Sequence, residues 1–363
     1  MTACATPPAD LAASRLGAVT EVPELLDALL RAPGPSGYED AATTAWRAAA
    51  GFARVSHDAL GSSVATVGED DGQPLLAIVG HIDEIGVVVT HVDEKGFAYF
   101  AQIGGWDPQI LVGQRVVIDG REGPVPGVVG RKPIHLLDSD ARKKVVELKE
   151  MHIDIGTTDE DEALALVRVG DAGVIAGEPE RLAGSRLVSR SLDNRLGCYV
   201  ALEVARRVAE RGEHSARVAA VAAVQEEIGS MGAGTTAYSL RPDVAIAVDV
   251  THATDAPGVS EKELGSHALG SGPAIGRGAR LAPRVHELLT AAAESAGIAY
   301  TVEASGRATH TDADSIQTSR AGIPTGLVSI PLRYMHSPVE MVDLDDVEAA
   351  VTLLVAFAEG LDS

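Results

Sequence analysis

Hydrophobic and polar residues alternate along this chain with the periods of helices and strands. Leucines recur at helical spacing over residues 23–30, and Gly34-Pro35-Ser36-Gly37 ends that helix before a second one over 38–50. β-like segments follow at 53–57 and 63–67. The continuous apolar run at 75–79 is typical of a strand buried on both faces. The chain therefore opens with two helices and enters a sheet that we expect to be covered on both sides.

The pattern changes between residues 86 and 175, where short β-like segments are separated by turn residues. These segments lie at 87–92, 97–103, 114–118 and 124–129, and Asp93-Glu94-Lys95-Gly96 has the composition of a tight turn. This stretch is predicted to form a small β-rich module inserted in the sequence.

Longer helices and strands alternate again beyond residue 187. Helices are expected at 194–211, 233–240, 281–297 and 345–359, and strands at 217–224, 244–249, 299–303 and 326–330. Such alternation predicts an α/β domain with a mostly parallel sheet. We therefore expect a discontinuous α/β domain formed by residues 15–85 and 176–363, interrupted by the module at 86–175, after a disordered start at 1–14.

Composition narrows the classes of partner. The 363 residues include 52 acidic and 30 basic side chains, a net charge of -22, and 45% of the residues are hydrophobic, as in acidic globular proteins. Because no basic patch is found, the charge predicts that the chain binds neither nucleic acid nor a membrane surface. Cys4 and Cys198 lie too far apart to suggest a disulfide framework. With neither a leader pattern nor an apolar run near the roughly 20 residues that span a bilayer, we expect a cytoplasmic protein.

Histidine and carboxylate residues follow three of the predicted strands. His81-Ile82-Asp83-Glu84 follows the strand at 75–79, Gln225-Glu226-Glu227 follows 217–224, and Asp249 ends 244–249. Ligands bind outside the carboxyl ends of strands in open α/β sheets, so these side chains are expected to meet at one edge. Ser191-Leu192-Asp193-Asn194, at the mouth of a helix, and Tyr334-Met335-His336, after the last strand, join the set.

Imidazoles and carboxylates without thiolates suit Zn²⁺, Co²⁺ or Mn²⁺ in a catalytic site. Two histidines and several carboxylates exceed the three protein ligands usual for one catalytic zinc. We therefore predict two divalent metal ions that share a carboxylate, roughly 3.5 to 4 Å apart, as is typical of hydrolases. A single His-x-Asp or Glu-Glu pair means little in a chain this acidic, and the hypothesis depends on their joint occurrence.

The adjacent Glu226 and Glu227 are expected to have different tasks. At the end of a strand, consecutive side chains point to opposite sides, so one can bind metal while the other faces the reacting water. We assign Glu226 as the general base. His252 and His310 lie near the site segments and are equally compatible with a structural or a functional role, whereas the remaining histidines are expected to be structural or exposed.

Six of these segments, in this order, resemble the successive motifs of the TET aminopeptidases, the glutamyl-aminopeptidase-like dinuclear metallopeptidases. They are His81-Ile82-Asp83-Glu84-Ile85-Gly86, Ile103-Gly104-Gly105-Trp106-Asp107, Ser191-Leu192-Asp193-Asn194-Arg195, Gln225-Glu226-Glu227-Ile228-Gly229, Ala247-Val248-Asp249-Val250 and Arg333-Tyr334-Met335-His336-Ser337-Pro338. The resemblance runs from about residue 34 to the C-terminus. Any one motif is unspecific, but six in order are highly specific.

The resemblance implies a set of metal ligands. Asp193 would bridge the two ions. His81 and Asp249 would complete one site. Glu227 and His336 would complete the other.

It also implies roles for two further carboxylates and for the inserted module. Glu226 would be the base, and Asp83 would orient His81 through its second ring nitrogen, a contact that the i, i+2 spacing permits. The implied fold is an α/β/α peptidase domain with an inserted, barrel-like module that drives dimerisation. Dimers would form a hollow homo-oligomer, a dodecamer, in which short peptides are the substrates.

Two positions depart from the family pattern. In Ala308-Thr309-His310-Thr311-Asp312-Ala313, His310 stands where the family commonly has glycine, and Ser271 stands where it often has lysine. His310 and Asp312 are candidate residues of the substrate pocket, where an imidazole could narrow the space or contact a substrate carboxylate; a tolerated loop substitution explains His310 equally well. Arg277 and Arg307 could favour acidic substrates or be surface residues.

Aminopeptidase activity is the leading functional hypothesis. A deacylase or deacetylase acting on small amides could use the same ligands. Some relatives are described as cellulases, but glycoside hydrolysis fits poorly, because it needs two carboxylates roughly 5 to 10 Å apart and no metal. A scaffold protein with a relic site would lack a ligand or the base, and neither is missing.

Overall fold

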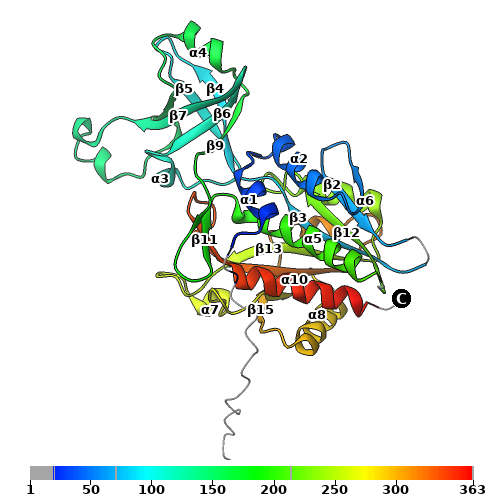
Figure 1. Cartoon of the computed structure of the whole chain (residues 1–363). Helices are drawn as coiled ribbons and strands as arrows, with labels where there is room; N and C mark the ends of the chain where they lie inside the picture. Colours follow the sequence, from blue (N-terminus) through cyan, green and yellow to red (C-terminus); the bar gives the residue numbers. More distant parts are fainter. Residues whose placement is uncertain (1–18, 20, 70–71, 213–214, 362–363) are drawn as a thin grey trace, which may run out of the picture.

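The structure is a computed structural model that describes residue 19 and residues 21–69, 72–212 and 215–361 (Figure 1). The predicted disordered segment at 1–14, with Cys4, lies outside these residues. The two opening helices are α1 (Glu24–Arg31) and α2 (Asp40–Ala49), and strands β1 (Arg54–His57), β2 (Ser63–Val67) and β3 (Leu75–His81) follow them. Cys198 is buried and its thiol is free.

An eleven-stranded mixed sheet forms the larger part of the molecule. Its main path runs β1-β2-β12-β3-β13-β16-β17-β11-β10, and β14 and β15 join it beside β16. The strands not yet given bounds are β10 (Glu180–Arg181), β11 (Arg186–Ser189), β12 (Arg217–Ala223), β13 (Val244–His252), β14 (Ala274–Gly278), β15 (Thr301–Ser305), β16 (Thr325–Arg333) and β17 (Glu340–Asp343). The four central strands β12, β3, β13 and β16 are parallel to one another.

The α/β class is confirmed, and the parallel pairing lies at the centre of the sheet. Antiparallel strands flank it: β2 pairs with β12, and β17 pairs with both β16 and β11. The strands β10, β11, β14 and β17 were not predicted, because they are short and carry charged residues or glycine, which hide a strand pattern.

Helices cover both faces of the sheet, as the apolar strand at 75–79 predicts. Leu76 and Ile78 of β3 belong to one core, and Leu75, Ala77 and Val79 belong to another. The first core lies under α1, α2, α5 (Leu192–Arg211), α8 (Pro283–Ala296) and α10 (Leu344–Glu359), and the second under α6 (Met231–Leu240) and α9 (Ala313–Ile316). The architecture is therefore α/β/α. No helix within the described residues is both long and apolar enough to cross a bilayer.

A closed, six-stranded antiparallel barrel projects from the sheet domain (Figure 1). Its strands are β4 (Gly86–Val92), β5 (Ala98–Ile103), β6 (Arg115–Gly120), β7 (Gly123–Arg131), β8 (Met151–Asp154) and β9 (Ala172–Ile175). The helices of this region are α3 (Pro108–Leu111), α4 (Glu160–Leu166) and the 3₁₀ turns η1 (Ile134–Leu136), η2 (Ala141–Lys143) and η3 (Leu148–Glu150). The barrel has its own apolar core, which includes Val89, Ile118 and Ile153. Its role in dimerisation stays a prediction.

Strand β3 passes extremely close to α5 at Gly80, the residue before His81. A β-carbon at Gly80 would lie 2.2 Å from the carbonyl carbon of Gly197 and 2.4 Å from the backbone nitrogen of Cys198. Both are backbone atoms of a packed helix, so they have little room to move aside. Glycine at 80 therefore allows the strand that ends at His81 to pack directly on the helix that begins near Asp193.

The variant Gly80→Ala is expected to lower the free energy of unfolding by about 3 kcal/mol. This value is at the upper end of the usual range for overpacking, because backbone atoms of α5 must move. Gly51→Ala is the matched control, since a β-carbon there would meet nothing within 4 Å. Thermal unfolding measures both. Equal midpoints for the two variants would contradict the close packing of β3 on α5.

Candidate metal centre

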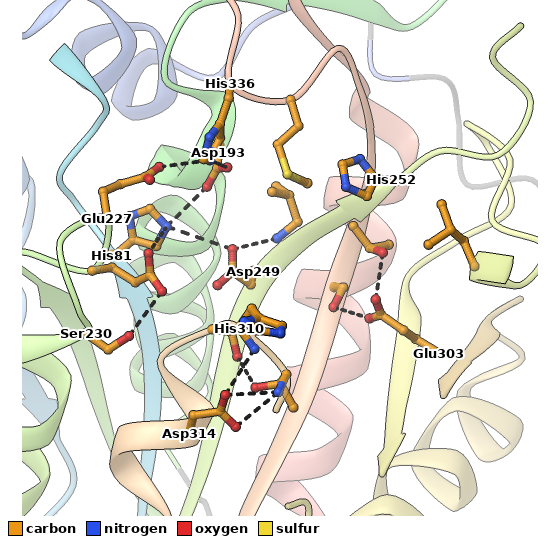
Figure 2. A pocket seen from close by; sticks show the side chains of 18 of the residues that line it. His81, Asp193, Glu227, Ser230, Asp249, His252, Glu303, His310, Asp314 and His336 are labelled. Carbon is orange, nitrogen blue, oxygen red and sulfur yellow. Dashed lines mark hydrogen bonds and ion pairs between the residues drawn. The ribbon is translucent and has the colours of Figure 1, made fainter. Parts of the chain in front are cut away.

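The carboxyl ends of the central parallel strands bring the predicted histidines and carboxylates to one place. His81 ends β3, Asp249 lies near the end of β13, and Glu226 and Glu227 follow β12. Asp193 enters from the first turn of α5, and His336 from the loop after β16. In Figure 2 the labelled side chains of His81, Asp193, Glu227, Asp249 and His336 point toward one another.

Two groups of potential metal ligands result, and both contain Asp193. In the first, the ligand atoms of His81, Asp193 and Asp249 lie within 4.8 Å of one another. His81 Nε2 lies 3.1 Å from Asp193 Oδ1 and 3.9 Å from Asp249 Oδ1. All three residues are buried.

The second group consists of Asp193, Glu227 and His336. His336 Nε2 lies 3.4 Å from Asp193 Oδ2 and 3.4 Å from Glu227 Oε1. Asp193 thus turns one carboxylate oxygen to each group. The resemblance implies the same five residues, with the same division between two sites and the same shared carboxylate; that they bind metal stays a prediction.

The histidine orientations suit metal binding. His336 Nδ1 donates a hydrogen bond to the carbonyl oxygen of Gly105 over 2.9 Å, which leaves the lone pair of Nε2 facing the two carboxylates. His81 directs Nδ1 toward Asp83 Oδ1 at 3.4 Å, while its Nε2 faces Asp193. Each imidazole therefore presents one nitrogen to the centre of the site.

The electrostatics of the site show a shortage of positive charge. Burial raises the pKa of Glu226 to about 7, and the neighbouring Glu227 and Asp193 carboxylates add to this rise. Burial also raises the pKa of Asp249 well above its ordinary value. Hydrogen bonds to Asp193 and Glu227 raise the pKa of His336 to about 11. Divalent cations would supply the charge that the crowded carboxylates need, so the donor set fits such ions.

Glu226 and Glu227 depart from the extended geometry that the sequence predicts. Strand β12 ends at Ala223, and Gln225 has a φ of 60°, so the two glutamates lie in a turn, where sides do not simply alternate. Both line the same cavity. Only Glu227 belongs to a ligand group.

Glu226 instead lies beside the ligand groups. Its Oε2 is 4.0 Å from His81 Nε2, and its Oε1 accepts a hydrogen bond from Ser230 Oγ over 3.1 Å. This arrangement directs Oε2 toward His81 at the wall of the cavity.

Asp83 holds the turn that carries these glutamates. Its carboxylate accepts the backbone N–H groups of Glu226 at 3.0 Å and Glu227 at 3.1 Å, and the hydroxyl of Ser36 at 2.6 Å. Although burial opposes ionisation, contacts with His81 and these donors keep the pKa of Asp83 below its ordinary value. Asp83 therefore connects β3 to the turn after β12 as well as facing His81.

Sequence reasoning missed Glu340, which holds two of the potential ligands by their backbone. Its carboxyl oxygens accept the N–H groups of Asp193 and His336, each over 3.0 Å, and its side chain is buried. In a chain with 52 acidic residues, nothing in the local pattern of β17 distinguishes this glutamate. Only the fold shows that it lies behind the site.

The ligand groups open into a cavity of about 790 Å³. His252 and His310 lie on its wall, whereas Asp312, the other predicted pocket residue, does not line it. Asp312 is buried, and neither of its carboxyl oxygens has a hydrogen-bond partner within the described chain. Arg277 and Arg307 are exposed and do not line the cavity either.

His310 has the backbone conformation that suits the glycine common at this position in the family that the sequence resembles. Its φ is 57°, in the left-handed region that glycine adopts without strain. The N–H groups of Thr309 and His310 donate to Asp314 and hold the loop in this conformation. The backbone thus keeps the conformation suited to glycine, while the side chain adds an imidazole to the cavity.

The variant His310→Gly is expected to unfold with a free energy equal to that of the parent chain or higher by up to about 1 kcal/mol, because it relieves the left-handed conformation. His252→Gly, which removes another imidazole from the same cavity, is the control. His252 ends β13 without a positive φ, so glycine there is expected to destabilise the fold. Chemical denaturation compares the two, and a clear loss of stability in His310→Gly would contradict the expectation.

Comparisons with known proteins agree on one family. The sequence model described as M42 glutamyl aminopeptidase matches residues 61–353. The lysyl aminopeptidase of Pyrococcus furiosus is 33% identical over 93% of this chain and 97% of its own length.

Solved structures also resemble the chain over most of its length. A TET aminopeptidase from a marine sediment archaeon of the Thaumarchaeota has a TM-score of 0.88 and 36% identity, over 93% of this chain and 96% of its own. The Pyrococcus horikoshii TET1 peptidase, which can assemble into a tetrahedron or a large octahedral shell, has a TM-score of 0.82 and 31% identity, over 93% and 99%. An endoglucanase from Thermotoga maritima has a TM-score of 0.74 and 28% identity, over 92% and 96%.

Proposed function

The chain belongs to the M42 glutamyl aminopeptidase family, and from that premise we propose that it is a metal-dependent aminopeptidase that removes N-terminal residues from short peptides. The observation that carries the proposal is the pair of potential ligand groups that share Asp193 and line the cavity. Glu226, which lies beside His81 and lines the same cavity, supplies the base that such chemistry needs.

Five residues would hold two divalent ions: His81 and Asp249 on one side, Glu227 and His336 on the other, and Asp193 between them. The mixture of imidazole and carboxylate suits Zn²⁺ or Co²⁺, and also Mn²⁺. Two such ions, when bound, polarise a carbonyl and lower the pKa of a water molecule.

Glu226 is the general base of the proposed reaction. Its Oε2 lies 4.0 Å from His81 Nε2 at the cavity wall, where it can take a proton from the attacking water and pass it to the leaving amine. The hydroxyl of Ser230 fixes the other oxygen. Burial raises the pKa of Glu226 to about 7 without bound cations, and two bound cations would favour its ionised form, which is the form that accepts a proton.

Asp83 and Glu340 are the positioning residues of this reaction. Asp83 holds the backbone of Glu226 and Glu227, and Glu340 holds the backbone of Asp193 and His336. Fixed backbone contacts of this kind keep the reacting side chains in the positions and orientations that the reaction needs.

We further propose that the chain forms a homo-oligomer through the barrel, and that dimers assemble into a larger shell. The support is the assembly of the Pyrococcus horikoshii relative, whose whole length this chain nearly covers. A closed shell with inward-facing sites would limit substrates to short peptides. Size-exclusion chromatography with light scattering tests this directly, and a monomer at micromolar concentration would contradict it.

Two other hydrolase activities differ from aminopeptidase activity in the substrates that they cleave. A deacylase would use the same ligands on N-acylated substrates. The endoglucanase relative raises glycoside hydrolysis, but the carboxylates here lie within 4.8 Å of histidines, whereas glycosidases place two carboxyl groups on either side of a sugar without metal.

The test compares matched tripeptides with free and N-acetylated N-termini, together with a soluble glucan, under one metal condition. The proposal predicts cleavage of the free peptides alone, with release of the first amino acid. Preferred cleavage of the acetyl group would identify a deacylase, and hydrolysis of the glucan would identify a glycosidase; either result would overturn the proposal.

A further inference from the structure

The cavity wall beyond the metal ligands is acidic. Among the described residues that line it there is no lysine or arginine, whereas Glu263, Glu303 and Asp314 all contribute carboxylates. Family membership does not decide what such a wall selects, because one relative is a lysyl aminopeptidase and the family is described by its glutamyl activity. The choice must come from the residues of this chain.

Glu303 is fixed close to the ligand Asp249 by two hydroxyl groups. Its Oε1 accepts from Thr251 Oγ1 and its Oε2 from Ser329 Oγ, each over 2.7 Å. Thr251 follows Asp249 by two residues on β13 and so lies on the same face, about 7 Å further along the strand. Ser329 is the direct neighbour of Asp249 on β16. Figure 2 draws both contacts of the Glu303 carboxylate as dashed lines.

The charge of Glu303 is not balanced within the described part of the chain. Both of its contacts are neutral hydroxyls, and no basic side chain pairs with it there. An ionised carboxylate has about four acceptor positions, so roughly half of its capacity is left for a ligand. The remaining acceptor positions of this partly buried carboxylate are therefore available to a cation that enters the cavity.

The other two acidic side chains differ in this respect. Asp314 accepts the N–H groups of Thr309 and His310 and lies 3.5 Å from Arg280, so its capacity is largely used. Glu263 is exposed on the short helix α7 (Glu261–Leu264), where water weakens its interactions. Glu303 is therefore the carboxylate best placed to bind a substrate side chain.

We propose that the cavity selects peptides whose N-terminal residue is lysine or arginine, and that Glu303 binds the cationic end of that side chain. This inference rests on the proposed aminopeptidase function. The reacting carbonyl must lie at the ligand groups, and Glu303 contacts Ser329 beside Asp249 and Thr251 further along β13, so a side chain with a cation at its end can reach it. An acidic N-terminal residue would instead meet uncompensated negative charge.

The test measures kcat/KM for the p-nitroanilides of lysine, arginine, leucine and glutamate on the metal-loaded protein. The parent chain is expected to prefer lysine and arginine over leucine, and leucine over glutamate. Glu303→Gln, which keeps the shape and can still contact the hydroxyls, is expected to lower kcat/KM for lysine and arginine by about 10- to 100-fold, the usual range for a lost charge-assisted hydrogen bond. Hydrolysis of the leucine substrate is expected to stay within about threefold.

Two further variants separate a local contact from other effects. Glu303→Lys is expected to reverse the preference toward glutamate. Glu287→Gln removes the same charge from the exposed outer side of α8, and it is expected to change none of the four rates. Leucine hydrolysis and the metal content report whether each variant has folded.

The possible results separate the specificity of the cavity from the aminopeptidase function. A parent chain that cleaves leucine or glutamate substrates better than lysine and arginine overturns this inference alone. An equal loss on all four substrates in Glu303→Gln also overturns it, because Glu303 would then only position the site. If the parent chain cleaves none of the four, the proposed function fails, and this inference fails with it.

Discussion

The variant Glu226→Gln is expected to lose nearly all turnover while it keeps its fold and its metal sites. Glutamine has the same shape, and its amide oxygen can still accept the hydroxyl of Ser230, which lies 3.1 Å from the carboxylate in the parent chain. It cannot accept a proton from water at neutral pH. Since general-base catalysis contributes about 10²- to 10⁴-fold, kcat is expected to fall by that factor.

Metal content separates this effect from damage to the site. Glu226 belongs to neither ligand group, so the variant is expected to bind as many ions as the parent chain. Glu227→Gln is the matched comparison, because it changes the adjacent glutamate that does belong to a group, and it is expected to lower metal content. A kcat of Glu226→Gln within a few-fold of the parent value would show that another residue is the base.

The variant Asp193→Ala is expected to lose both metal ions, and activity with them. Asp193 Oδ1 faces His81 and Asp193 Oδ2 faces His336, so one substitution removes a ligand from each group. Changes to residues behind the ligands already weaken metal binding by about 10- to 100-fold, so loss of the shared ligand is expected to weaken it by more than about 100-fold.

Single-group variants provide the comparison for Asp193→Ala. Asp249→Ala changes only the group with His81, and His336→Ala changes only the group with Glu227. Each variant is therefore expected to lose the ion of the changed group more readily than the ion of the unchanged group. Elemental analysis after dialysis measures the number of ions per chain. Two ions retained by Asp193→Ala would contradict the shared role of this carboxylate.

The ligand groups could be predicted from the sequence because the fold places them by a simple rule. Central parallel strands end at one edge, so a histidine or carboxylate directly after such a strand must lie there. His81, Asp249 and the glutamates after β12 follow that rule, whereas the resemblance to the family's motifs supplied Asp193, His336 and the division of the ligands between two ions. The α/β/α layers were predictable for a related reason, since the apolar run of β3 has both its faces in a core.

The rest of the site depends on contacts that no local pattern records. Glu340 and Glu303 lie on strands β17 and β15 and look like any other surface glutamate in this acidic sequence. The turn at Gln225, which places both following glutamates in one cavity, needs a positive φ that glutamine rarely adopts. The close packing of Gly80 on Gly197 is a property of two distant segments and is visible only in three dimensions.

The central claim is that two divalent ions, held by the groups that share Asp193, drive peptide hydrolysis. The most direct measurement strips the protein with a chelator, then adds Zn²⁺, Co²⁺ or Mn²⁺ in steps while both the ions bound per chain and the hydrolysis of a free-N-terminal peptide are recorded. We predict no hydrolysis without metal and full hydrolysis only as the second ion binds. Full hydrolysis by the stripped protein, or a maximum reached with one ion per chain, would contradict the account.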